Sequence, residues 1–131
     1  MSKISFKILV GLLVVMLGTG INCKRQTNSI DLSINLEQER KIQMAVDKGH
    51  QPWRLDSVSV AVVALKSAGY KEIGDQNCEN IFIKNGAAEV HCRGEYSYFI
   101  QLKKMVRLDG IWTAISINIF RLGFFLDSQS D

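Results

Sequence analysis

The chain has 131 residues, of which 47% are hydrophobic, with a single proline and a formal net charge of +3. This length favours one domain, and the single proline excludes proline-rich segments. Two of the positive charges, Lys3 and Lys7, precede a long apolar run, and the rest of the chain carries a net charge of only +1. A basic surface of the kind that binds nucleic acid is therefore not expected, and we predict no nucleic acid partner.

The N-terminus has the pattern of an export signal. Two lysines precede an apolar core at residues 8–17, and small residues follow at 18–20. A positive start, a short apolar core and a small-residue exit predict export. The rival interpretation is an uncleaved membrane anchor, but residues 8–21 would span only about 21 Å as a helix, against about 30 Å of hydrocarbon. We expect residues 1–22 to be a signal peptide and the protein to be periplasmic, extracellular or anchored at the cell membrane.

Cys23 lies where the apolar run gives way to charged residues, and two interpretations of it remain open. Its distance from the apolar core resembles that of the acylated first residue of bacterial lipoproteins, although Gly20, Ile21 and Asn22 match the lipoprotein pattern only in part. On this interpretation Cys23 is the lipidation site and residues 23–34 form a tether to the membrane. At the end of this segment Ile30, Leu32, Ile34 and Leu36 alternate with polar residues, a pattern of either a short strand or a loop that packs on the core. Alternatively, signal peptidase cuts after Gly20 and leaves Cys23 as a free thiol.

The other two cysteines, Cys78 and Cys92, flank a predicted hairpin with an Asn-Gly turn at residues 85–86. Export exposes them to oxidising conditions, so we expect them to form a disulfide. A two-residue hairpin loop places Cys78 opposite Arg93, whereas a three-residue loop or a bulge near Glu79 places it opposite Cys92. The disulfide therefore predicts a departure from the simplest hairpin.

No metal or cofactor is expected. Zinc needs three or four converging ligands, but His91 and Cys92 alternate along a predicted strand and point to opposite faces, and His50 is distant in sequence. The sequence contains no phosphate-binding loop, dinucleotide fingerprint or zinc motif, and no serine lies in a glycine-rich nucleophile elbow. A catalytic site is therefore not predicted.

Two helices are predicted in the first half of the domain. Asn35 begins a capping-box pattern that opens a helix over residues 36–48, which has only a thin apolar face. Asp56 or Ser57 caps a second helix, whose residues 58–65 have valine and alanine at helical spacing on a wide face. We expect the second helix to be largely buried and the first to cover the core.

Strand patterns follow these helices. We expect a short strand at residues 70–73, then hairpins of 79–84 with 87–93 and of 95–108 with 111–121, the latter around an Asp-Gly turn. In the second hairpin a two-residue loop opposes Leu108 and Ile111 and places the apolar residues on one face, with Lys104 marking a bulge or bend. Residues 122–131 form a C-terminal tail, whose first half, LGFFL at 122–126, is apolar and either adds an edge strand or docks on the domain.

Two groups of residues are candidates for binding. Trp53 and Arg54 lie in the turn between the helices, where Arg54 is expected to pair with Asp47 or Asp56 and the tryptophan either anchors the turn or binds a partner. The second group lies on the mixed face of the last hairpin and comprises Lys103, Arg107, Trp112 and Phe120. Within it, Arg107 is expected to lie over Trp112 in a cross-strand cation–π contact.

The order of two helices followed by an antiparallel sheet that ends in VRLDGIWTAISI resembles small exported NTF2-like or cystatin-like domains. The residues that carry this resemblance are Asp109, Gly110 and Trp112. Separately, AVDKGHQPWRLD, at residues 45–56, is similar to a segment of small exported bacterial proteins, which brings no activity with it. We expect an α+β domain at residues 35–121, with two N-terminal helices packed on one face of a bent four-stranded antiparallel sheet.

These observations predict a non-catalytic accessory or binding module at the bacterial cell envelope. It would be held at the membrane through an N-terminal lipid or an uncleaved signal and would bind a protein partner. One alternative is an NTF2-like small-ligand carrier or enzyme with a pocket between sheet and helices; the Asp and His pair that such enzymes use cannot be mapped here. Another is an inhibitor or immunity-type protein that docks on one partner.

Overall fold

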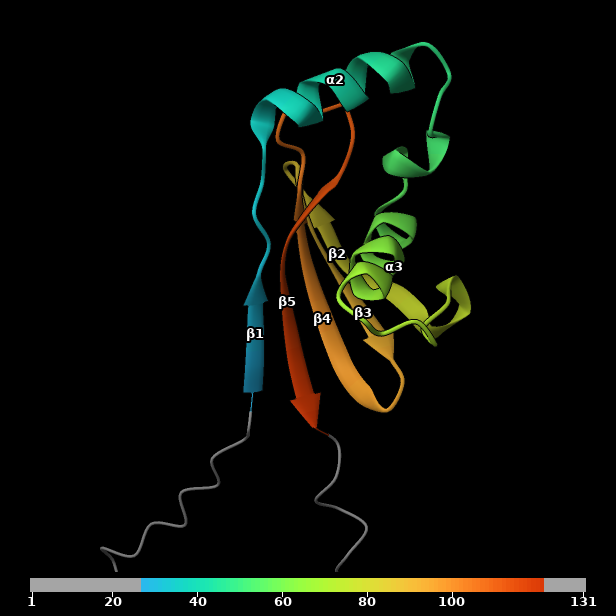
Figure 1. Ribbon diagram of the computed structural model, residues 1–131, viewed down its shortest axis with the longest axis vertical. Coiled ribbons are helices and arrows are strands. Elements are labelled where there is room, and N and C mark those ends of the chain that lie inside the picture. Colours follow the sequence, from blue (N-terminus) through green and yellow to red (C-terminus); the bar gives the residue numbers. More distant parts are fainter. Residues whose placement is uncertain (1–26, 122–131) are drawn as a thin grey trace, which may run out of the picture.

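The computed structural model describes residues 27–121, which form an antiparallel sheet with helices against one face and one end (Figure 1). The strands are β1 (Thr27–Asp31), β2 (Cys78–Lys84), β3 (Ala87–Arg93), β4 (Tyr96–Lys103) and β5 (Thr113–Arg121). The helices are α2 (Leu36–Asp47) and α3 (Ser57–Ser67), with short 3-10 helices η1 (Pro52–Leu55) and η2 (Asp75–Asn77). The predicted α+β class is confirmed.

The sheet has five strands in the order β1-β5-β4-β3-β2, one more than the four predicted. The additional strand, β1, lies within the segment expected to be a tether. It pairs antiparallel with β5, and its Ile30 lies opposite Ile117 and contacts the core. One apolar side chain in a five-residue edge strand is a weak local signal, so the pairing with β5 decides the conformation of this segment.

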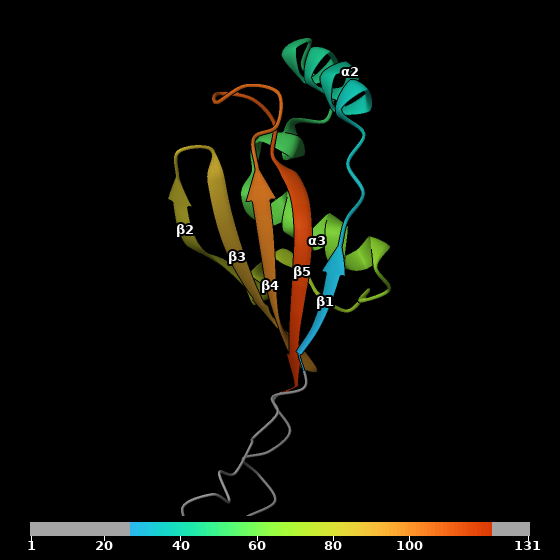
Figure 2. The same ribbon diagram turned by 90° about the vertical axis from the view of Figure 1, so that its left-hand side faces the viewer.

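The helix α3 packs across one face of the sheet, in contact with strands β2 to β5, and leaves the other face open (Figure 2). Asp56 caps it by accepting a hydrogen bond of 2.8 Å from the amide of Ser59. The predicted helix over 58–65 is thus confirmed. The core between α3 and the sheet comprises Val60, Ala61, Leu65, Ile73, Ala88, Val90, Cys92, Tyr98, Ile100, Leu102, Trp112, Ile117 and Ile119.

The position of α2 differs from the prediction. Asn35 caps it as expected, with its side chain accepting a hydrogen bond of 3.1 Å from the Gln38 amide. The helix crosses the end of the sheet instead of packing on its face (Figure 1). Its only buried residues are Gln43 and Val46, so it has too little apolar surface to cover a sheet face.

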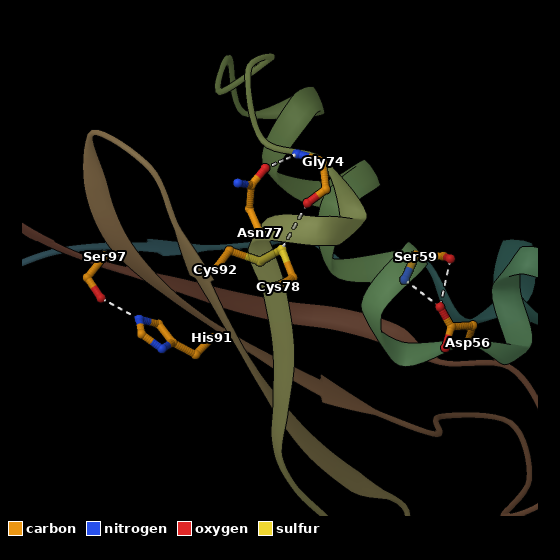
Figure 3. The surroundings of a disulfide bond; sticks show 8 residues. All are labelled: Asp56, Ser59, Gly74, Asn77, Cys78, His91, Cys92 and Ser97. Carbon is orange, nitrogen blue, oxygen red and sulfur yellow. Dashed lines mark hydrogen bonds between the residues drawn. A yellow bond between two sulfur atoms is a disulfide. The ribbon is translucent and has the colours of Figure 1, made fainter.

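The first hairpin combines a tight turn with a bulge. Asn85 and Gly86 both have positive φ, 51° and 73°, which is the backbone of a two-residue turn whose twist matches that of the strands. The register then shifts between Asn80 and Phe82, and this places Cys78 directly opposite Cys92. The two cysteines form a disulfide with their Cα atoms 4.1 Å apart (Figure 3). The predicted pairing of the two cysteines is confirmed, and the bulge is the predicted departure from the simplest hairpin.

The second hairpin does not have the predicted two-residue loop. β4 ends at Lys103 and β5 begins at Thr113, so residues 104–112 form a loop. The predicted strand pairing fails there because the amides of Ile111 and Trp112 donate to Gln43 Oε1 (2.8 Å) and to the Arg54 carbonyl (2.9 Å) instead of to β4. Within the strands, a register shift beside Gln101 and Leu102 keeps the apolar residues on one face.

Residues 70–73 form turns and irregular backbone, so the short strand predicted there is wrong. Tyr98 is fully buried and packs in a tilted contact on Tyr70, with ring centroids 4.9 Å apart. Burial raises the pKa of the Tyr98 phenol to about 12, so this core side chain stays neutral at physiological pH.

We predict that replacing both Cys78 and Cys92 with alanine lowers the free energy of unfolding by about 3 kcal/mol. The two cysteines are 14 positions apart, and a disulfide that closes a loop of this length in the unfolded chain contributes about that much. Urea unfolding of the oxidised protein and of the double variant measures the difference. The unreduced and reduced native protein form the control pair and should differ in the same direction. Equal unfolding midpoints for all samples would contradict the prediction.

Candidate functional site

A groove of about 470 Å³ lies beside the core, between α3 and the segment that leads from β1 to α2. This volume is within the range of roughly 300–1,000 Å³ that is typical of small-molecule sites. The wall is mostly apolar, with β1, the linker after it, η1, α3 and β5 all contributing. Its lining residues are Ile30, Leu32, Ser33, Ile34, Glu39, Trp53, Arg54, Val60, Val63, Ala64, Ser67, Ala68, Thr113 and Ala114.

A charged pair provides the polar part of the groove. Arg54 from η1 donates to the Glu39 carboxylate of α2, and both side chains are almost buried, with 12% and 13% of their surface exposed. The hydroxyl of Thr113, the first residue of β5, donates to the same carboxylate oxygen at 2.7 Å. Glu39 therefore joins α2, η1 and β5 at one point, and this point forms part of the groove wall.

The guanidinium of Arg54 retains a free donor. Its Nε is buried and has no hydrogen-bond partner among residues 27–121. Leaving a buried donor unpaired costs about 1–3 kcal/mol, and somewhat more when the group is charged. Because the atom is buried, an oxygen atom in the groove can accept from it only after the Arg54 side chain moves. The site thus combines an apolar wall with a donor that lacks an acceptor.

Of the predicted binding residues, the structure places Trp53 and Arg54 in the groove wall. The tryptophan ring also packs against the core, with the Arg54 guanidinium carbon 5.6 Å from its centroid. The expected partner of Arg54 was wrong, because the guanidinium pairs with Glu39 and not with Asp47 or Asp56. The sequence suggested partners close to Arg54 in the chain, whereas the fold brings Glu39, fifteen positions away, to the guanidinium.

The second predicted group does not form a common surface. Trp112 is 4% exposed and belongs to the core, while Phe120 lies on the opposite, open face of the sheet. Lys103 is exposed at the end of β4. The predicted contact of Arg107 with Trp112 is wrong, since the cation over that ring is Lys104, with Nζ 4.7 Å from the centroid.

Arg107 instead attaches the 104–112 loop to α2. Its two terminal nitrogens donate to the Asp47 carboxylate at 2.6 and 2.8 Å, and its Nε donates to Asp109 at 2.9 Å. The hydrogen bonds from Arg107 lower the pKa of Asp47 below its usual range. Gln43, 3% exposed, donates to Asp47 at 3.0 Å and accepts from the Ile111 amide. Gly110 is needed here because an added Cβ would collide with the Gln43 side chain.

The open face of the sheet has an aromatic centre. The His91 ring stacks on Phe99 with centroids 4.4 Å apart, and Phe99 meets Phe120 edge-on at 5.3 Å. His91 Nε2 and the Ser97 hydroxyl form a hydrogen bond, which Figure 3 draws, and the two atoms lie 2.5 Å apart. Burial, followed by the charge of Arg93, lowers the pKa of His91 below 6.5. This face is therefore partly apolar and neutral at its centre.

Sequence reasoning missed Glu39, Gln43 and Thr113. Each lies in an element that was predicted or close to one, but its role depends on contacts between residues at least fifteen positions apart. One signal was available in the sequence: the alternation of Ile30, Leu32 and Ile34 indicated a segment that packs on the core, and these residues line the groove.

Comparison with family models, curated proteins and solved structures finds no match to the chain. No helix within residues 27–121 is long and apolar enough to cross a membrane. The same residues contain no group of three or more His, Cys, Asp or Glu side chains arranged to hold a metal ion. Cys23, the predicted lipidation site, and the tail at 122–131 lie outside the described residues.

We predict that Glu39→Gln lowers the free energy of unfolding by about 3–5 kcal/mol, because it leaves the Arg54 guanidinium nearly buried without its counter-charge. Urea unfolding followed by circular dichroism measures the change. Glu37→Gln is the matched control, since it makes the same substitution on the same helix in an exposed ion pair with Lys41. The control should change stability by no more than about 0.5 kcal/mol. Equal effects of the two substitutions would refute a special role for Glu39.

We also predict that the folded state loses stability as the pH falls below about 6.5, through His91. The pKa of His91 is lower in the folded state, so below pH 6.5 the unfolded chain binds protons that the folded protein does not. Urea midpoints at about pH 7.5 and pH 5 should differ less for His91→Gln than for the native protein. His50→Gln, a change at an exposed histidine, is the control and should retain the native difference. An unchanged pH dependence in His91→Gln would count against this assignment.

Proposed function

We propose that this protein is a non-catalytic binding module, exported and held at the bacterial cell envelope through its N-terminus. We further propose that its groove binds a small neutral amphipathic molecule. The observation that carries the proposal is the combination, in one groove, of an apolar wall and an almost buried ion pair with an unsatisfied donor. Ligand sites typically have this composition, in which a few polar groups fix the orientation of an apolar body.

The charges around the groove favour a neutral ligand. Glu39 and Arg54 neutralise one another, so an anionic head group gains attraction from the guanidinium but meets the carboxylate at the same point. A hydroxyl or carbonyl oxygen avoids this conflict and can accept from Arg54. The apolar part of the ligand would lie along Leu32, Val60 and Ala64. A medium-length hydrocarbon chain with an alcohol or ester head has the required chemistry.

Two further features support the wider proposal. The positively charged start and apolar core of residues 1–17 are typical of exported proteins, and acylation of Cys23 would hold the domain at the membrane, where amphipathic molecules are abundant. The finer fold assignment, an NTF2-like or cystatin-like roll, is also part of the proposal. A helix against an antiparallel sheet, with a cavity beside their contact, supports it.

The proposal can be tested with N-phenyl-1-naphthylamine, a neutral apolar fluorophore, and with 1-monodecanoylglycerol as competitor. We expect the fluorophore to brighten on binding and the monoacylglycerol to displace it. Val63 lines the groove and is 42% exposed, so Val63→Glu should place a charge in the apolar wall without unfolding α3. We expect this variant to bind the fluorophore about tenfold more weakly, since an apolar ligand in the groove would strip water from the new carboxylate, which is costly.

Lys66→Glu is the matched control, because it introduces the same side chain on the same helix at an exposed position that does not line the groove. It should bind as the native protein does. Circular dichroism of both variants confirms that the helix is intact. Equal binding by native protein and Val63→Glu, or failure of the monoacylglycerol to compete, would refute the proposal.

A further inference from the structure

The outer edge of β2 has features that edge strands usually avoid. β2 is the last strand of the sheet and pairs only with β3 among residues 27–121, as Figure 2 shows. Three successive apolar residues in its middle, Ile81, Phe82 and Ile83, are 48%, 47% and 57% exposed. A seven-residue edge with exposed apolar side chains and no proline is a template for pairing with another strand.

The opposite edge of the sheet differs in these respects. β1 has five residues, TNSID, of which four are polar, and its single apolar side chain, Ile30, points to the core. The two edges therefore differ in how well they are protected against pairing with another strand. The contrast makes the β2 edge, and not the β1 edge, the candidate for pairing with another strand.

We propose that β2 pairs antiparallel with β2 of a second copy of this chain, joining two sheets across a two-fold axis. The charges of the strand support a second copy as the occupant, because Glu79 and Lys84 bracket the apolar residues. In an antiparallel pair centred between Ile81 and Phe82, each Glu79 lies opposite Lys84 of the other copy. The strand is thus complementary to itself, as a two-fold interface requires.

The bulge in β2 makes this pairing geometrically consistent. In a regular strand Glu79 and Lys84 would point to opposite faces, because they are separated by an odd number of positions. Here Glu79 lies opposite His91 and Lys84 opposite Ala87, and these two β3 residues share one face. The register shift between Asn80 and Phe82 therefore brings both charges to the open face. There they can meet their counterparts from a second copy across the new pair of strands.

The existing partner of Glu79 does not oppose the proposal. Its ion pair with Arg93 is 3.4 Å long, and both side chains are mostly exposed, at 65% and 72%. An exposed pair of this kind contributes little to stability, so Glu79 can turn toward Lys84 of a second copy at small cost. Two such cross-copy pairs would fix the register of the apolar residues between them.

Charge reversal gives a direct test. Two copies of the full chain, carrying different C-terminal affinity tags, are co-expressed with export, extracted in mild detergent and purified through one tag. We expect the native copies to co-purify. Glu79→Lys in both copies, or Lys84→Glu in both, places like charges opposite one another twice, and co-purification should fall about tenfold or more.

The mixed pair is the decisive sample. When one copy carries Glu79→Lys and the other Lys84→Glu, both cross-copy contacts again join opposite charges, and co-purification should return to near the native level. This recovery also shows that each variant folds. Glu95→Lys in both copies, an exposed charge reversal outside β2, is the control and should behave as native.

Three results would overturn the proposal. The first is co-purification of the Glu79→Lys pair at the native level, which would place any association elsewhere, for example in residues 122–131 or residues 1–22. The second is failure of the native copies to associate at all, which would leave another chain or another segment as the occupant of β2. Failure of the mixed pair to recover would exclude the proposed register.

Discussion

The hydrogen-bonded carboxylate of Glu39 is the interaction on which the position of α2 depends. The helix has almost no apolar surface with which to hold itself on the domain, and Val46 is its only buried apolar side chain. Contacts of Glu39 with Arg54 and Thr113 therefore hold its first half, and Gln43 and Asp47 hold its second half against the 104–112 loop. Because the same ion pair lines the groove, the contact that anchors the helix also shapes the wall of the groove.

Local signals in the sequence predicted the elements whose conformation is decided locally. Asn35 and Asp56 identified two helix starts through the side-chain oxygens that cap them. The Asn-Gly pair at residues 85–86 identified a tight turn, and the cysteine spacing required a bulge that the structure contains. These predictions succeeded because each depends on residues close together in the chain.

The predictions that failed concern residues whose conformation or partner is decided by contacts with distant parts of the chain. The Asp-Gly pair at residues 109–110 has the composition of a tight hairpin turn, but the amides beside it bond to α2 and η1, and the strands end early. Arg107 was expected to meet Trp112 nearby and instead pairs with Asp47, sixty positions away. For the same reason only two of the residues that line the groove, Trp53 and Arg54, were predicted as a binding element, whereas the roles of Glu39 and Thr113 emerged only from the fold.

If Cys23 is acylated, the early start of β1 limits how far the domain can lie from the membrane. The strand begins at Thr27, four residues after Cys23, and an extended chain covers at most about 14 Å over that span. If Cys23 carries the lipid, the sheet stands almost directly on the bilayer, on the end farthest from α2 (Figure 1). The start of β1 would then lie close to the lipid head groups, and α2 with the 104–112 loop would lie at the end of the domain farthest from the membrane.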